Sequence, residues 1–143
     1  MDDTAYMRIA LEEAEAAFRA DEIPVGAVVV CKDRIIARTH NLTETLNDVT
    51  AHAEMQAITS ASDFLGGKYL NDCTMYVTVE PCVMCAGAIG WSQLGRLVYG
   101  ADDVKRGYSK FAAGALHPKT AVVRGVLAEE SAALMSDFFR KKR

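Results

Sequence analysis

The chain of 143 residues is 50% hydrophobic and 24% charged, which suits a single domain over residues 1–143 with a buried core and excludes a disordered tail. It contains no apolar run of about 18 residues and begins without the basic and apolar regions of a signal peptide, so we expect a soluble cytoplasmic protein with no membrane segment. The net charge of −3 is unevenly distributed: residues 1–22 carry seven acids and two bases, whereas residues 96–143 carry five acids and ten bases. The basic residues near the C-terminal end either bind a polyanion or are simply solvated.

The first elements in chain order are a helix and a hairpin. Residues 4–20 place apolar side chains at spacings of three and four, with glutamates outside this stripe, which predicts an amphipathic helix. Short β-branched runs at 27–31 and 34–38 flank the turn Lys32-Asp33 and predict two antiparallel strands. A polar loop over 41–49 leads toward the next helix.

The middle of the chain predicts a helix, a strand and a second helix. Thr50 is a good N-cap for a helix over 51–64. Residues 73–79 are rich in β-branched and apolar side chains and predict a third strand. The next helix is predicted to begin near Pro81, where the missing N–H is harmless, and to end with Gly95 as its C-cap.

The C-terminal part predicts strands over 96–100 and 121–126 and a last helix over 128–140. Because helices alternate with strands after the hairpin, we expect an α/β domain built in layers. The strands at 73–79 and 96–100 should run parallel, joined by a right-handed crossover. The predicted inner face of the last helix consists of Leu134, Met135, Phe138 and Phe139.

Two short segments at predicted helix starts carry metal-binding residue types, namely His52-Ala53-Glu54 and Pro81-Cys82-Val83-Met84-Cys85. On a helix, Cys82 and Cys85 share one face, so both thiolates can bind one ion at about 2.3 Å. A redox pair is the rival interpretation, but it does not account for the histidine and the glutamate at the other helix start. The spacing therefore favours a metal site.

The number of protein ligands separates a structural ion from a catalytic one. Cys73 lies on an extended strand too far from the cysteine pair, and Cys31 is more simply a small buried apolar residue. No spacing connects His40 or His117 to the pair. A zinc ion would then keep its fourth position open for water, as catalytic sites do. The protein ligands would be His52, Cys82 and Cys85.

Glu54 has two interpretations that the residues leave open. Side chains two positions apart within a helix point to nearly opposite sides, so Glu54 shares a site with His52 only if this first turn is irregular. In that case it can act on the water at the metal. Otherwise it is a first-turn acid that complements the helix dipole.

The combination H-A-E followed by P-C-x-x-C resembles the signature of the zinc-dependent cytidine and nucleobase deaminase superfamily. Within that superfamily the chain is most similar to the tRNA adenosine deaminases, and the similarity extends over nearly the whole chain. The segments that carry it are Pro24 to Ala27, Thr50 to Glu54, Tyr76 to Ile89 and Gly125 to Arg140.

The resemblance implies a three-layer α/β/α cytidine deaminase-like fold with a mixed five-stranded sheet. It implies one Zn²⁺ ion per chain on His52, Cys82 and Cys85, with Glu54 as the proton shuttle. Asn41 matches an asparagine that contacts the target nucleoside in the family. The implied activity is hydrolytic deamination of adenosine to inosine at the wobble position of a tRNA anticodon stem-loop, by a homodimer.

The segment over 101–120 departs from the family pattern, so contacts there do not carry over from the resemblance. Its Lys105 and Arg106 suit phosphate contact, and its aromatic residues suit base stacking or the core equally well. At the C-terminal end, Arg140 begins a run of four bases that also suits phosphates.

Two alternatives to this function remain open. A guanine deaminase, or another small-molecule nucleobase or nucleoside deaminase, would share the zinc motif, but the four terminal bases offer little to a neutral purine. A non-catalytic zinc-containing RNA-binding subunit should have lost the proton shuttle, and Glu54 is present.

Overall fold

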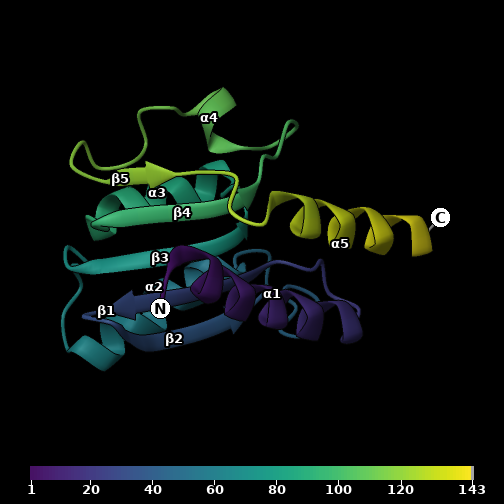
Figure 1. Cartoon of the computed structure of the whole chain (residues 1–143), viewed down its shortest axis with the longest axis horizontal. Helices are drawn as coiled ribbons and strands as arrows, with labels where there is room; N and C mark the ends of the chain where they lie inside the picture. Colours follow the sequence, from purple (N-terminus) through teal and green to yellow (C-terminus); the bar gives the residue numbers. More distant parts are fainter. Residues whose placement is uncertain (143) are drawn as a thin grey trace.

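The computed structural model describes residues 1–142 and has a five-stranded sheet at its centre (Figure 1). The strands are β1 (Gly26–Cys31), β2 (Arg34–His40), β3 (Cys73–Val79), β4 (Arg96–Ala101) and β5 (Ala121–Val123). Their order is β2-β1-β3-β4-β5; β1 is antiparallel to β2 and β3, whereas β3, β4 and β5 are parallel. The predicted hairpin and the predicted parallel crossover are both confirmed.

Helices cover both faces of this sheet. The longer ones are α1 (Asp3–Arg19), α2 (Ala53–Leu65), α3 (Val83–Ser92) and α5 (Ala128–Lys141), and the short α4 (Tyr108–Phe111) lies beside α3. α1 and α5 pack on one face, and α2 and α3 lie together on the other (Figure 1). The predicted three-layer α/β/α arrangement around a mixed sheet is therefore confirmed.

An apolar core fills the space on each side of the sheet, and β1 shows how one strand serves both. Val28 and Val30 belong to the core under α1, whereas Ala27 and Val29 belong to the core that α2 covers. All four residues are buried. A β-branched run that is apolar on both faces is typical of a strand in the middle of a sheet. Packing on both faces holds the strands in position, and with them the helix starts to which they lead.

Two helix ends differ from the predictions. His52, not Thr50, is the N-cap of α2, because the Thr50 hydroxyl donates a hydrogen bond within the preceding turn. The C-cap of α3 is Gln93, which adopts a left-handed φ of 55°, rather than Gly95. A Cβ at position 95 would lie 2.2 Å from the carbonyl oxygen of Asn71, so Gly95 permits close backbone contact instead of capping a helix.

The C-terminal third also differs from the predictions in detail. β5 ends at Val123 instead of extending to 126, and Gly125 then turns the chain with a φ of 83°. On α5, the predicted inner-face residue Phe138 is buried, whereas Phe139 is 42% exposed. Arg143, part of the predicted basic terminus, lies outside the described residues. No helix within residues 1–142 has the length and apolar character needed to cross a membrane.

Candidate metal centre

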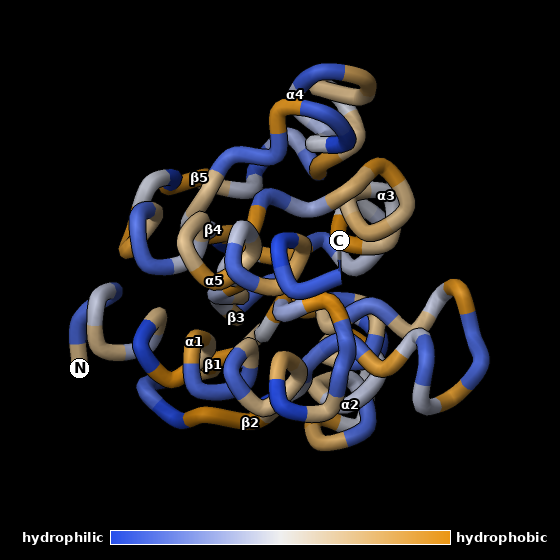
Figure 2. The backbone as a smooth tube through the Cα atoms, turned by 90° about the vertical axis from the view of Figure 1, so that its right-hand side faces the viewer, coloured by the Kyte–Doolittle hydropathy of each residue, from blue (hydrophilic) through white to orange (hydrophobic). Residues whose placement is uncertain are grey.

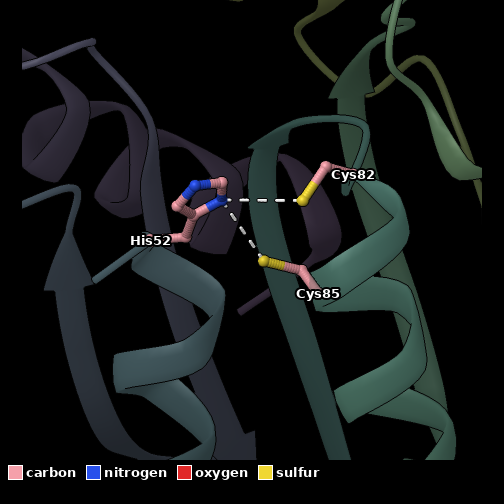
Figure 3. A group of neighbouring side chains, drawn as sticks. All are labelled: His52, Cys82 and Cys85. Atoms are coloured by element: carbon pink, nitrogen blue, oxygen red, sulfur yellow. Dashed lines mark hydrogen bonds between the residues drawn. The ribbon is translucent and has the colours of Figure 1, made fainter. Parts of the chain in front are cut away.

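The candidate ligands lie where α2 and α3 begin (Figure 3). His52 is the N-cap of α2, with an extended backbone at φ −68° and ψ 154°, and Cys82 is the N-cap of α3 at φ −74° and ψ 174°. Cys85 follows one turn later and is buried. Pro81 stands before the N-cap rather than within the helix. The two helix N-termini bring partial positive charge to this place, which favours thiolates there.

The three ligand atoms are spaced for a tetrahedral ion. His52 Nδ1 is 3.6 Å from Cys82 Sγ and 3.5 Å from Cys85 Sγ (Figure 3). Zinc bonds of about 2.3 Å to sulfur and about 2.0 Å to nitrogen, at tetrahedral angles, require a nitrogen–sulfur distance of about 3.5 Å. These residues therefore fit a zinc ion. Within residues 1–142, they are the only group of His, Cys, Asp or Glu side chains gathered closely enough to hold a metal.

The two thiols differ in acidity. A hydrogen bond with Cys85, reinforced by His52, lowers the pKa of Cys82 to about 4. The same interaction with Cys82, together with burial, raises the pKa of Cys85, and Cys82 also raises the pKa of His52. One negative charge is thus stable on the pair without a cation, and a bound dication would favour loss of the second thiol proton. Metal affinity should therefore rise with pH.

Glu54 lies beside the same three residues, although it is only two positions from His52. Burial raises the pKa of this carboxyl to about 7, the charge of Cys82 acts in the same direction, and the Cys85 thiol is within hydrogen-bonding reach. Both side chains reach one site because His52 precedes the helix with an extended backbone, so helical rotation does not separate them. A carboxyl that titrates near neutral pH at such a place suits proton transfer.

The remaining cysteines and histidines lie elsewhere. Cys31 and Cys73 face each other across β1 and β3, at the opposite end of β3 from Cys82. His40 is hydrogen-bonded to a glutamate of α1, and His117 accepts a backbone N–H within its own turn. None of these four residues belongs to the candidate metal cluster among residues 1–142, and the set of three protein ligands stays a prediction.

Asn41 follows β2 at the start of the loop that leads to His52. Its side chain is 5% exposed. Nδ2 donates to the carbonyl oxygen of Ile23 at 3.3 Å, and Oδ1 accepts the N–H of Thr43 at 3.2 Å. The amide therefore maintains the shape of this loop, and its contact with substrate stays a prediction.

Two buried glutamates, Glu22 and Glu80, were not singled out from the sequence. Burial alone would raise the pKa of Glu22, but hydrogen bonds from Thr45 and from the backbone N–H of Glu44 outweigh burial. The pKa of Glu22 is therefore lower than usual. Glu80, two residues before Cys82, accepts hydrogen bonds from the segment that follows β4. The available sequence signal for Glu80 is an acid placed between an apolar strand and a helix start.

The predicted RNA contacts lie on the surface. Lys105 and Arg106 are exposed on the loop between β4 and α4. Of the aromatic residues in that segment, Tyr108 is buried and Phe111 is 61% exposed. Arg140 is exposed near the end of α5 and pairs with an aspartate of the same helix, which neutralises part of its charge.

One face of α3 is apolar and exposed. Figure 2 shows α3 as a largely apolar helix at the edge of the molecule, beside α4. Trp91 is 86% exposed there, and Val83 and Met84 on the same helix are 45% and 36% exposed. Gly87 leaves this surface open, with nothing near the position of a Cβ. A contiguous apolar patch of this kind is typical of a protein–protein interface.

The family model for MafB19-like deaminases matches residues 1–143. Similar relatives are the tRNA-specific adenosine deaminases of Agrobacterium fabrum, 45% identical over 98% of this chain and 95% of the relative, and of Bacillus subtilis, 44% identical over 99% and 91%. A structure from a study of A-to-I editing by tRNA:A34 deaminases is 44% identical, with a TM-score of 0.86 over 92% of this chain and 99% of that one. The guanine deaminase from Nitrosomonas europaea is 28% identical, with a TM-score of 0.84 over 94% of this chain and 83% of that one.

Proposed function

Because this chain belongs to the MafB19-like deaminase family and is similar over its whole length to tRNA-specific adenosine deaminases, we propose that it deaminates adenosine to inosine at the wobble position, position 34, of a tRNA anticodon. The observation that carries this proposal is the buried Glu54 carboxyl beside the cluster of His52, Cys82 and Cys85. Zinc deaminases combine these residue types to activate water. We further propose that residues 1–143 form one deaminase domain that works in the cytoplasm, where its tRNA substrate is found.

The proposed cofactor is one zinc ion per chain. Two sulfur donors and one imidazole nitrogen at tetrahedral spacing fit zinc and leave its fourth position to a water molecule. When bound, zinc would supply a Lewis acid that lowers the pKa of that water to about 7.

Glu54 moves the protons of the proposed reaction. As the oxygen of a water molecule bonds to C6 of adenine, the Glu54 carboxylate accepts one water proton and delivers it to N1. The carboxylate then accepts the second proton from the same oxygen and passes it to the amino group, which leaves as ammonia while C6 becomes a carbonyl. The pKa of about 7 allows Glu54 to take and to release a proton at neutral pH.

We propose that Asn41 contacts the target nucleoside and that Lys105, Arg106 and Arg140 contact RNA phosphates. Lys105 and Arg106 support this proposal because they are exposed on the loop that passes next to the metal-binding turn at Cys82. An anticodon loop is single-stranded, so moving one base out of the stack costs only a few kcal/mol.

We propose a second copy of the chain as the protein partner. The exposed apolar residues of α3, with Trp91 the most exposed of them, support a homodimer, because water would otherwise contact these side chains. Since α3 begins at Cys82, such a dimer would bring two metal sites onto neighbouring helices.

The test compares substrates. Purified protein is incubated with an adenine-34 anticodon stem-loop, free adenosine, cytidine and guanine, and both inosine and ammonia are measured. We expect inosine from the stem-loop. Ammonia from guanine alone would support the guanine deaminase alternative. The observation that favours this alternative is the similarity to the guanine deaminase from Nitrosomonas europaea. Binding of RNA without release of ammonia would support the non-catalytic alternative.

A further inference from the structure

Glu80 is a buried carboxylate whose partners all belong to the segment after β4, here called the 102–111 loop (Asp102–Phe111). Its side chain is 4% exposed. Oε1 accepts the N–H of Asp103 at 3.0 Å, and Oε2 accepts the N–H and the hydroxyl of Ser109 at 3.0 Å and 2.5 Å. Charge-assisted hydrogen bonds of this kind are about twice as strong as neutral ones, so the carboxylate holds both ends of the loop.

The backbone that follows Glu80 is connected to the same loop. Cys82 forms an isolated antiparallel bridge with Gly107, and the N–H of Tyr108 donates to the carbonyl of the proline before Cys82 at 2.9 Å. A Cβ at position 107 would lie 2.4 Å from the Glu80 carboxylate, so glycine there is what admits the carboxylate. The 102–111 loop is thus packed directly against the turn that carries a candidate metal ligand.

The loop also carries three exposed cations, and two of them, Lys105 and Arg106, precede α4. Their backbone N–H groups donate to Asp103 Oδ1 at 3.1 Å and 3.0 Å. Asp103 is itself held through its own N–H by Glu80. The buried carboxylate therefore fixes the residue around which this basic turn is folded.

We propose that Glu80 is a positioning residue for RNA: it holds the 102–111 loop against the Cys82 turn, so that Lys105 and Arg106 meet phosphates beside the target base. This inference rests on the proposed function, because it takes an anticodon stem-loop as the ligand. A loop that is already ordered loses less conformational entropy when RNA binds. Lys105 and Arg106 therefore bind phosphate more tightly.

The test variant is Glu80→Gln, whose amide has the same shape but offers a single acceptor oxygen, so at least one hydrogen bond to the loop is lost. We expect the Kd and the KM of a stem-loop to rise about tenfold, the effect of one charge-assisted contact, with a smaller change in kcat and no loss of zinc. The slope of log Kd against log salt should also become shallower, by about 0.7 for each lost phosphate contact.

Further variants separate positioning from a general effect on folding. Ser109→Ala removes one bond to Glu80 without altering the metal-binding turn, and it should raise the Kd in the same direction by a smaller factor. Asp63→Asn, an exposed change of equal charge near the end of α2, should bind RNA like the wild type. In a Lys105→Ser/Arg106→Ser background, Glu80→Gln should cause no additional loss, because residues that act through one another are not additive.

An unchanged Kd in Glu80→Gln, or effects that add fully to those of the double-serine variant, would overturn the proposal. If Glu80→Gln loses its zinc, the Kd of Ser109→Ala becomes the test. A wild-type Kd in Ser109→Ala would then overturn the proposal. Because the Kd is measured without turnover, a wild-type protein that binds the stem-loop but forms no inosine contradicts the proposed function and leaves this inference standing.

Discussion

His52 owes its position in the metal centre to its place just before α2. Its backbone is extended, at φ −68° and ψ 154°, and not helical. The imidazole therefore lies beside Cys82 and Cys85. Glu54, already inside the first turn, can then reach the same site. Shifting the helix start by one residue would separate the candidate ligand His52 from Glu54, so the proposed combination of metal binding and proton transfer depends on this N-cap.

At the scale of single residues, Cys85→Ala should release the metal. A site with two remaining protein ligands binds zinc far more weakly, and the free energy that the ion contributes to folding is lost with it. Metal analysis of the purified variant should find zinc well below one ion per chain, and its melting temperature should fall. Cys73→Ala, which changes a buried cysteine outside the cluster, should keep its zinc. Full zinc occupancy in Cys85→Ala would contradict the ligand assignment.

Glu54→Gln separates the two interpretations of that residue. If the carboxyl carries protons, zinc and fold should persist while the deamination rate falls by ~10² or more. A first-turn acid that only complements the helix dipole would cost up to about 1 kcal/mol of stability and leave turnover nearly intact. The single-turnover rate tests the proton-shuttle interpretation, and the free energy of unfolding tests the helix-dipole interpretation. Turnover at the wild-type rate would refute the proton shuttle.

At the scale of elements, α1 is attached to the sheet at its first residue. Asp3 accepts two hydrogen bonds from Arg96 at the start of β4 and one, at 2.8 Å, from the Tyr76 hydroxyl on β3. Asp2 caps the helix by accepting the N–H of Ala5. One carboxylate thus connects a helix to two central strands, in addition to the apolar stripe that the helix buries.

The pH dependence of stability should report this attachment. Hydrogen bonds from Arg96 lower the pKa of Asp3 from its ordinary value of 3.8, so its contribution is complete above that value and disappears as the pH falls through the lower pKa of the folded state. Asp3→Asn should therefore cost roughly 1 kcal/mol at pH 7, since the pair is partly exposed. Urea unfolding at a series of pH values measures this difference. A difference that stays constant down to the lowest pH would show that the charge of Asp3 is irrelevant.

The sequence predicted those elements whose signals are local. Helical spacing located α1, and the residue types at 52–54 and 82–85 indicated a metal site near two helix starts, although Thr50 was wrongly predicted as the cap of α2. The end of α3 was wrong because Gln93 adopts a left-handed conformation that sequence preferences assign to glycine. Glu80 was missed because its partners, two backbone N–H groups and one hydroxyl, lie more than twenty residues away in the sequence, and its position between a strand and a helix start does not identify them.

At the scale of the whole molecule, the functional features gather around α3. Two of the three candidate metal ligands lie at its start, its exposed side chains include apolar ones, and the 102–111 loop with Lys105 and Arg106 packs beside it. A second copy that covered these apolar side chains would place the surface for RNA next to a subunit boundary. The proposed dimer and the proposed substrate site are therefore parts of one region.

Trp91→Glu should convert the proposed dimer into a monomer. A charge within an apolar interface would have to be buried without a partner, which opposes association strongly. Analytical ultracentrifugation of the wild type and the variant measures the mass in solution. Phe64→Glu changes a half-exposed aromatic residue on α2 and should leave the dimer intact. A variant at Trp91 that associates as the wild type does would exclude this face as the interface.

His52 and Cys82 are separated by 30 residues, and the chain between them contains α2 and the central strand β3. An ion bound to both would close this stretch into a ring. Ring closure of that length removes conformational entropy from the unfolded chain worth about 3.5 kcal/mol at 25 °C, as a disulfide does. In a reducing compartment, where disulfides do not persist, the proposed ion would serve as a cross-link of the fold in addition to its proposed part in the reaction.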